Sequence, residues 1–153
     1  MVLTLGNKSY LSYSGYGYSR KLCQTVTTWF LNKFLPRHVL DIEVLHRGMK
    51  LEDSFGYCDY TGSSYRPREF CIELQSNMSK KDYTKTLLHE LVHLRQWVKG
   101  TLRMKSGRMH FDGENVSTMD YMSQPHEIEA MELEEKLYNE FIYDTVGDWL
   151  DDE

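Results

Sequence analysis

Residues 87–96 read LLHELVHLRQ. Within this stretch, His89, Glu90 and His93 form the HExxH pattern, which in a helix brings both imidazoles to one face. Two neutral imidazoles one turn apart can bind a single metal ion, and zinc suits them well. Glu90 directly follows the first histidine, so it can accept a proton from a water molecule activated by that ion. The pattern therefore predicts one Zn²⁺ ion, with Glu90 as the general base.

The flanking residues predict an amphipathic helix from Asp82 to Val98, which ends at Gly100. At about 100° of rotation per residue, four apolar side chains fall within one narrow stripe of this helix. His89 and His93 lie on roughly the opposite side, so one face can pack on a core while the other presents metal ligands. The apolar stripe consists of Leu87, Leu91, Leu94 and Val98.

A second helix is predicted from about Pro125 to about Asp144, and one carboxylate lies within its apolar stripe. Glu127 is at the centre of that stripe, whereas Glu129 lies on the opposite, solvated face. A carboxylate inside an apolar face is costly unless a cation compensates it. We therefore expect Glu127 to be the third zinc ligand. The side chains that flank it are Ala130, Met131, Leu137, Tyr138, Phe141 and Ile142.

Several other side chains are candidates for the same site. Glu134 lies near the inward face and fits either an acceptor for a ligand histidine or a buried salt bridge. His126 either contacts substrate or helps the helix to start, and His110 is the alternative third ligand of an all-histidine site. The group that stabilises a developing oxyanion is left open. The candidates for that role are Tyr57, Tyr60, Arg95, Tyr121 and His126.

The order of the expected elements favours an α+β fold with a single domain over residues 1–153. A helix from Ser19 to Leu35 precedes three strands, and a hairpin from Thr101 to Asp112 follows the HExxH helix. Residues 1–18 are expected to be a mobile arm or an edge strand, and residues 113–124 a loop. The three strands are Val39–His46, Phe55–Thr61 and Phe70–Leu74.

Composition restricts the class of protein. Hydrophobic residues at 41% and charged residues at 27% are typical of globular proteins. A net charge of -5 argues against a dedicated nucleic-acid binder. No signal sequence and no apolar run of about 20 residues is visible, so we expect a cytoplasmic protein without a membrane partner. The cysteines suit a reducing compartment, because Cys23, Cys58 and Cys71 are odd in number and form no CxxC pair.

Basic residues cluster after the HExxH helix, and two interpretations stay open. The cluster is either a patch for an acidic substrate or a nucleic-acid backbone, or a solvated hairpin edge protected by charge. Its members are Lys99, Arg103, Lys105 and Arg108.

An HExxH helix followed by a glutamate on a later helix resembles the gluzincin branch of zinc peptidases. The segment Glu127–Ala130 matches the ExxA form of ImmA/IrrE-type proteases and minigluzincins, and residues 38–140 are similar in layout to SprT-like metallopeptidases of tailed bacteriophages. The resemblance implies a zincin fold, with a small, twisted, mostly antiparallel sheet packed on the HExxH helix. It also implies His89, His93 and Glu127 as zinc ligands and Glu90 as the catalytic base.

The resemblance further implies a peptidase that cleaves protein or peptide substrates, in the host cytoplasm if the chain is phage-encoded. In zincins a strand at the edge of the sheet binds extended substrate, and here that strand would be Phe70–Leu74. The chain departs from Spartan-type members, which use a third histidine where this sequence offers Glu127. That departure weakens the transfer of DNA–protein crosslink processing, and a non-catalytic zincin-like binding module is a further alternative.

Overall fold

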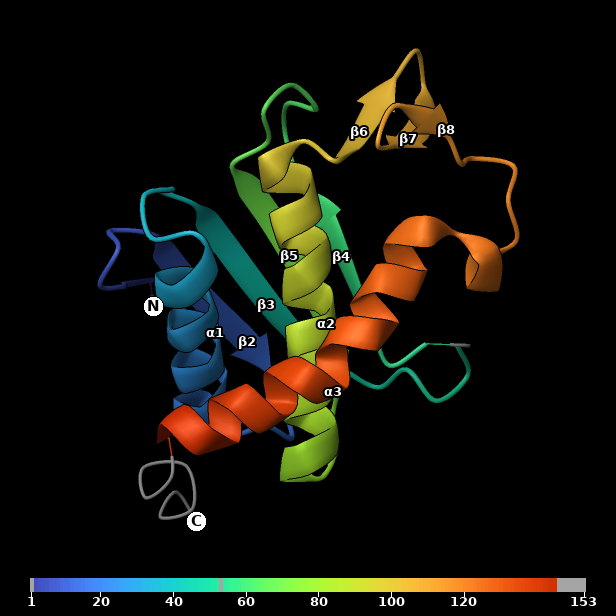
Figure 1. Cartoon of the computed structure of the whole chain (residues 1–153). Coiled ribbons are helices and arrows are strands. Elements are labelled where there is room, and N and C mark those ends of the chain that lie inside the picture. The colour runs from blue at the N-terminus through green and yellow to red at the C-terminus, as the bar shows by residue number, and fades with distance from the viewer. Residues whose placement is uncertain (1, 53, 146–153) are drawn as a thin grey trace.

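The computed structural model describes residues 2–52 and 54–145, which form an α+β fold with three α-helices (Figure 1). The helices are α1 (Arg20–Phe34), α2 (Lys80–Lys99) and α3 (Pro125–Thr145), and a 3₁₀ turn, η1 (Tyr121–Ser123), precedes α3. The strands are β1 (Val2–Thr4), β2 (Tyr10–Gly15), β3 (Asp41–Arg47), β4 (Gly56–Tyr60), β5 (Glu69–Gln75), β6 (Leu102–Lys105), β7 (Arg108–Phe111) and β8 (Glu114–Asn115).

The main sheet has the order β1-β2-β3-β5-β4 and is mixed rather than mostly antiparallel. Strands β2, β3 and β5 run parallel, while β1 and β4 lie antiparallel at the two edges. The expectation of a mostly antiparallel sheet was therefore wrong. The parallel pairing has a physical reason in α1. This helix returns the chain across the sheet after β2, so β3 is added beside β2 in the parallel direction.

The N-terminal segment is an integral part of this sheet. Strand β1 lies at the edge of the sheet, which is one of the two alternatives expected for this segment, whereas β2 pairs with β1 on one side and with β3 on the other and is an inner strand. The alternative of a mobile arm was wrong for residues 2–15. The alternation of Tyr10–Gly15 explains this position, because Leu11 enters the core and is fully buried. The Tyr and Ser residues around Leu11 obscured the strand in the sequence.

One face of the sheet is covered by helices and the other faces solvent. On β3, Ile42 and Val44 are buried, whereas Asp41 and Glu43 are exposed. Helices α1 and α2 pack on the buried face, and α3 crosses over α2 on the side away from the sheet (Figure 1). Helix α2 is thus covered from both sides, which explains why it is buried around most of its circumference.

Local signals mark both ends of α2; the predicted end at Gly100 is confirmed, whereas the helix begins two residues before the predicted Asp82. The Ser79 side chain accepts a hydrogen bond from the Asp82 amide at the start. Gly100 ends the helix in the left-handed conformation, with φ of 81°.

After α2, the expected hairpin is present as β6 and β7, and it extends into a second, three-stranded sheet. The expectation of a plain loop at residues 113–124 was wrong where β8 and η1 form. The two other predicted helices and the three predicted strands are confirmed with small shifts of their ends. Within the described part of the chain, no helix has both the length and the apolar character that a membrane span requires.

Candidate metal centre

The crossing of α2 and α3 brings His89, His93 and Glu127 together. One ligand atom from each of the three lies within 4.8 Å of the others, so the group can hold a metal ion. Glu127 Oε1 is 3.1 Å from Nε2 of His89 and 3.0 Å from Nε2 of His93. All three side chains are buried or nearly so. Two adjacent turns of one helix and the first turn of another therefore converge on one point.

The separations of the donor atoms suit a small divalent ion. Ligands that lie about 2.0–2.1 Å from a tetrahedral zinc are roughly 3.3 Å apart from each other. The two nitrogen-to-oxygen distances, 3.0 and 3.1 Å, are close to that separation. Two imidazoles and one carboxylate are also a donor set that zinc accepts. The residues present therefore fit such an ion.

The outer nitrogens of both histidines are held by hydrogen bonds. His89 Nδ1 lies 2.9 Å from Glu134 Oε1, and His93 Nδ1 lies 2.9 Å from Gln96 Oε1. If each Nδ1 donates its proton to these acceptors, each Nε2 is left to face Glu127. Glu134 thus has one of the two roles expected for it. Gln96 was missed by the sequence analysis, although its place three residues after His93 on the same helix was a usable signal.

The site attracts positive charge. Burial works to lower the pKa of His89, but hydrogen bonds with Glu127 and Glu134 outweigh burial and raise that pKa to about 10. Burial alone would raise the pKa of Glu127, yet hydrogen bonds with His89 and His93 hold it well below its usual range. Three carboxylates, counting Glu90, surround the imidazoles. A metal ion would supply this positive charge in place of protons, which makes its binding dependent on pH.

Glu90 lies beside the three ligand candidates but is not one of them. Its side chain is buried, and burial raises its pKa to about 7 although the neighbouring imidazoles oppose the shift. A pKa near neutrality suits a group that takes up and releases a proton. Strand β4 reaches close to Glu90 at Gly56, where an added Cβ would lie 3.1 Å from both Cγ and Oε2 of the glutamate. Glycine at this position therefore lets β4 approach the site.

A cavity of about 450 Å³, which we call the metal-site cavity, opens beside this group. Strand β4 forms one wall, and β4 lies at the edge of the sheet. The expectation that Phe70–Leu74 would be the edge strand near the site was wrong, because β5 lies between β3 and β4. The cavity is lined by Ser54, Gly56, Tyr57, Cys58, Asp59, Glu90, His93, Trp97, Leu102, Met109, Tyr121, His126 and Glu127.

We compared the chain with models of protein families, with curated proteins and with solved structures. None of the three comparisons found a match.

Three of the five candidates for oxyanion stabilisation line the metal-site cavity, namely Tyr57, Tyr121 and His126. The Tyr121 hydroxyl donates to Glu127 Oε1 at 2.9 Å, and His126 is buried with its ring 5.8 Å from that of His93. The other two candidates point elsewhere. The Tyr60 ring packs on Trp97 at 5.0 Å, and the Arg95 guanidinium lies over the Phe34 ring.

The remaining alternatives lie outside the metal group. His110 is on β7, where its Nδ1 contacts the Arg108 carbonyl oxygen at 3.0 Å, so the structure does not bring it to His89 and His93. Glu129 is exposed, as expected, and accepts a hydrogen bond from the Gln96 amide at 2.9 Å. The tail from Asp148 to Glu153, expected to be acidic and frayed, lies outside the described residues.

Proposed function

We propose that this protein is a zinc-dependent peptidase. One observation carries the proposal: two imidazole nitrogens on α2 converge on one carboxylate oxygen of α3, with a buried glutamate beside them. His89, His93 and Glu127 would hold the ion, and Glu90 would be the general base. The metal-site cavity next to this group offers room for a substrate.

Zinc is the metal that this donor set suits best, because two imidazoles and one carboxylate with an open position are typical of catalytic zinc sites. When bound, it would supply Lewis-acid activation of a water molecule and of the peptide carbonyl. Hydrogen bonds that the two Nδ1 atoms donate to Glu134 and Gln96 would keep the imidazoles in the orientation that binding requires.

Glu90 would carry the proton transfer. It takes a proton from the attacking water and later delivers it to the amine that leaves. Its burial supports this role, since a carboxyl group with a pKa raised to about 7 is poised to exchange protons at neutral pH. Tyr121 is the best placed of the cavity side chains to donate to the oxygen that becomes negative, because its hydroxyl already reaches Glu127.

The edge strand supports a polypeptide substrate. Within the described residues, β4 is paired with β5 on one side only, so its other edge presents main-chain groups beside the cavity. An extended peptide can pair with such an edge by adding a strand to the sheet. Strands β1 and β2 lie at the opposite side of the sheet, so the tyrosine-rich N-terminal segment does not obstruct this approach.

The cavity beside the candidate metal ligands also supports an enzyme over a non-catalytic module. Structural zinc sites are typically closed by a fourth protein ligand, whereas catalytic sites leave one position for water or substrate. Here Glu90, His93 and Glu127 all face the same cavity. Among the described residues, the group of potential metal ligands at this site has three members, not four.

The decisive experiment separates metal binding from cleavage. We expect one zinc ion per chain by elemental analysis, and cleavage of an unfolded protein such as reduced casein. Glu90→Gln should keep the zinc and slow cleavage by about a thousandfold, because it removes the base without changing the shape. Glu127→Ala should lose zinc affinity, and Glu132→Gln, on the exposed face of α3, should change neither.

Each failure has its own meaning. Cleavage that survives Glu90→Gln would remove Glu90 as the base. A chain that binds no zinc would end the metal hypothesis. Zinc binding without cleavage of any member of a broad peptide library would favour the non-catalytic module.

A further inference from the structure

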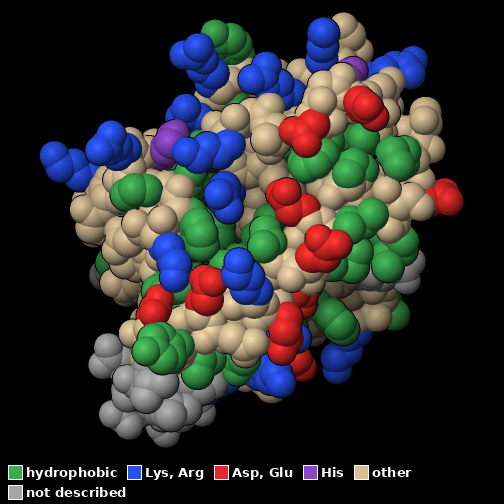
Figure 2. Space-filling model, in the orientation of Figure 1, with side chains coloured by type: hydrophobic (Ala, Val, Ile, Leu, Met, Phe, Trp, Pro, Cys, Tyr) green, Lys and Arg blue, Asp and Glu red, His purple; other side chains and the backbone are tan. Residues whose placement is uncertain are grey.

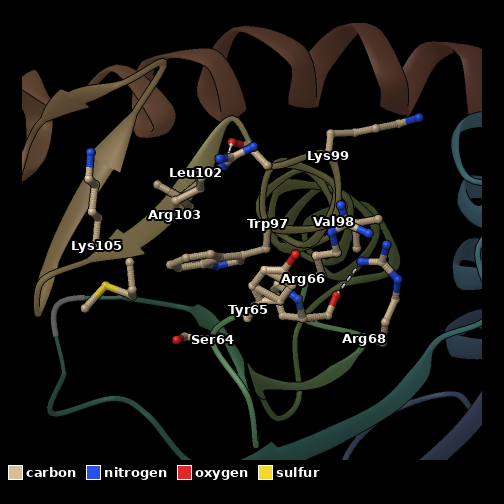
Figure 3. A pocket seen from close by; sticks show the side chains of 13 residues that line it. Ser64, Tyr65, Arg66, Arg68, Trp97, Val98, Lys99, Leu102, Arg103 and Lys105 are labelled. Atoms are coloured by element: carbon tan, nitrogen blue, oxygen red, sulfur yellow. Dashed lines mark hydrogen bonds between the residues drawn. The ribbon is translucent and has the colours of Figure 1, made fainter.

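A second cavity, which we call the basic cavity, lies at the carboxyl end of α2. Its volume is about 480 Å³, and it is enclosed by α2, by strand β6 and by the loop between β4 and β5. The indole of Trp97 extends from α2 into the space between β6 and the segment with Ser64 and Tyr65 (Figure 3). Five cationic side chains line this cavity, and no carboxylate does among the described residues. The cations are Arg66, Arg68, Lys99, Arg103 and Lys105.

Among the described residues, no carboxylate side chain pairs with these five cations. Arg68 and Arg103 donate to the backbone carbonyl oxygens of Pro67 and Gly100, at 2.8 and 2.6 Å, and Arg66 lies over the Tyr65 ring. Arg66, Lys99, Arg103 and Lys105 are exposed, so water and salt screen them, and they stay available to pair with an anionic ligand.

The cluster is part of a broader basic surface. Lys and Arg side chains gather along the upper part of the molecule, over the end of α2, the β4–β5 loop and the hairpin (Figure 2). Three of the four basic residues singled out in the sequence line the basic cavity, and Arg108 does not. Arg66 and Arg68 join them from a loop more than thirty positions earlier in the chain, which explains why the sequence did not reveal the cavity.

The basic cavity adjoins the metal-site cavity. Trp97 and Leu102 line both of them. Tyr60, the last residue of β4, packs edge-on against Trp97 with ring centroids 5.0 Å apart. Beyond Tyr60 the chain leaves the edge strand and enters the loop that forms the wall of the basic cavity. A peptide that pairs with β4 beside Glu90 and continues past Tyr60 would therefore reach this cavity.

We propose that the basic cavity binds an acidic segment of the polypeptide substrate, a few residues from the bond that is cleaved. This inference rests on the proposed function, because it assigns the substrate class of that same site. Carboxylates of the substrate would pair with the guanidinium groups of Arg66, Arg68 and Arg103, which offer planar forks for such pairing. Lys105 would add a further positive charge at the β6 side.

A polypeptide fits these observations better than a nucleic acid does. The cations line a hollow that adjoins an open strand edge, and a strand edge recognises peptide backbone. A nucleic acid requires a basic path along its phosphates, whereas this chain carries a net charge of -5.

The test measures binding without cleavage. The zinc-loaded Glu90→Gln chain is titrated against a labelled decapeptide that carries four glutamates, and against its counterpart with four glutamines, by fluorescence anisotropy. We expect the glutamate peptide to bind about tenfold more tightly at low salt, and the difference to shrink as salt is added. Adding Arg66→Gln and Lys105→Gln should remove most of that preference, because both side chains are exposed and line the basic cavity.

A matched control removes two charges elsewhere. Lys50→Gln with Lys136→Gln changes the net charge equally at exposed positions outside the basic cavity, and should leave the preference intact. Circular dichroism confirms that each variant is folded. The proposal is overturned if both double variants lose the glutamate preference equally, or if the starting chain shows no such preference. Tighter binding of a single-stranded oligonucleotide that depends on Arg66 and Lys105 also overturns it, in favour of nucleic acid.

Failure here is distinguishable from failure of the proposed function. Binding of the acidic peptide is measured with the base already removed, so it does not depend on turnover. If the glutamate preference holds but no substrate is cleaved, the basic cavity is a docking site and the peptidase assignment is wrong. If cleavage occurs without any glutamate preference, the peptidase assignment stands and this inference is wrong.

Discussion

Oε1 of Glu134 lies 2.9 Å from Nδ1 of His89, so a carboxylate on α3 orients an imidazole on α2. A histidine whose outer nitrogen donates to a carboxylate keeps one tautomer and becomes a stronger metal ligand. His93 has a neutral acceptor instead, the Gln96 amide oxygen. Helix α3 therefore contributes twice to the same site, once through Glu127 and once through Glu134. The crossing of these two helices is what the site depends on.

Replacing Glu134 with Gln tests this relationship. The amide can still accept the hydrogen bond but lacks the negative charge, so we expect zinc affinity to fall by about tenfold. Competition with a chromophoric chelator measures the change. Glu135→Gln is the matched control. Glu135 follows Glu134 in the chain, but its carboxylate pairs with Lys85 and contacts neither histidine. Equal zinc affinity in the Glu134 variant and the wild type would contradict the role given to Glu134.

Tyr121→Phe tests the group that stabilises negative charge during cleavage. Loss of one well-placed donor at such a position lowers kcat by about a hundredfold. We expect this loss with KM and zinc affinity little changed, measured by steady-state cleavage and by chelator competition. Tyr143→Phe, at an exposed position near the end of α3, is the control. If zinc affinity falls while kcat per bound zinc is unchanged, the Tyr121 hydroxyl serves only to hold Glu127.

The metal group was predictable from the sequence because its signals are local. His89 and His93 are fixed by the four-residue spacing, and Glu127 stands out as a carboxylate within an apolar helical stripe. Both signals survive in the structure, since the two helices cross where those faces meet. The HExxH motif, helical periodicity and the cost of an uncompensated buried carboxylate together selected these three side chains.

The arrangement of strands was less predictable. Alternation locates a strand but does not say which neighbour it pairs with, and β4 could have been added on either side of β5. Strand β4 pairs with β5 on the side away from β3, so the sheet edge beside the site is Gly56–Tyr60. Local sequence patterns likewise did not indicate that Arg66 and Arg68 line the same cavity as Arg103. Contacts between residues far apart in the sequence determine both the position of β4 and the grouping of these arginines.

A buried histidine away from the metal group connects stability to pH. His46 is 1% exposed on β3, stacks on Tyr18 with ring centroids 3.5 Å apart, and contacts the Tyr83 hydroxyl at 2.9 Å. Its Nδ1 lies 2.9 Å from the Ser14 carbonyl oxygen, which requires the proton on Nδ1. Burial lowers the pKa of His46, and the contact with Ser14 opposes that shift without cancelling it. The fold therefore prefers the neutral imidazole.

The sign of the effect follows from linkage. Above about pH 6.5 His46 is neutral in both the folded and the unfolded chain, and its full contribution to stability is present. As the pH falls below that value, the unfolded chain takes up a proton before the folded one does, so the free energy of unfolding declines. The decline from this group is limited to about 1.4 kcal/mol per pH unit. It ends once the pH is below the lowered folded-state pKa.

His46→Gln isolates this contribution. We expect the variant to be less stable than the wild type at pH 7.5, and the gap between them to narrow as the pH falls to 5, because the variant has no proton to gain there. Urea unfolding at a series of pH values, with both chains at equal zinc loading, measures the gap, so that titration of His89 and His93 cancels. A His46→Gln gap that stays constant or widens on acidification would mean that His46 is not held neutral by the fold.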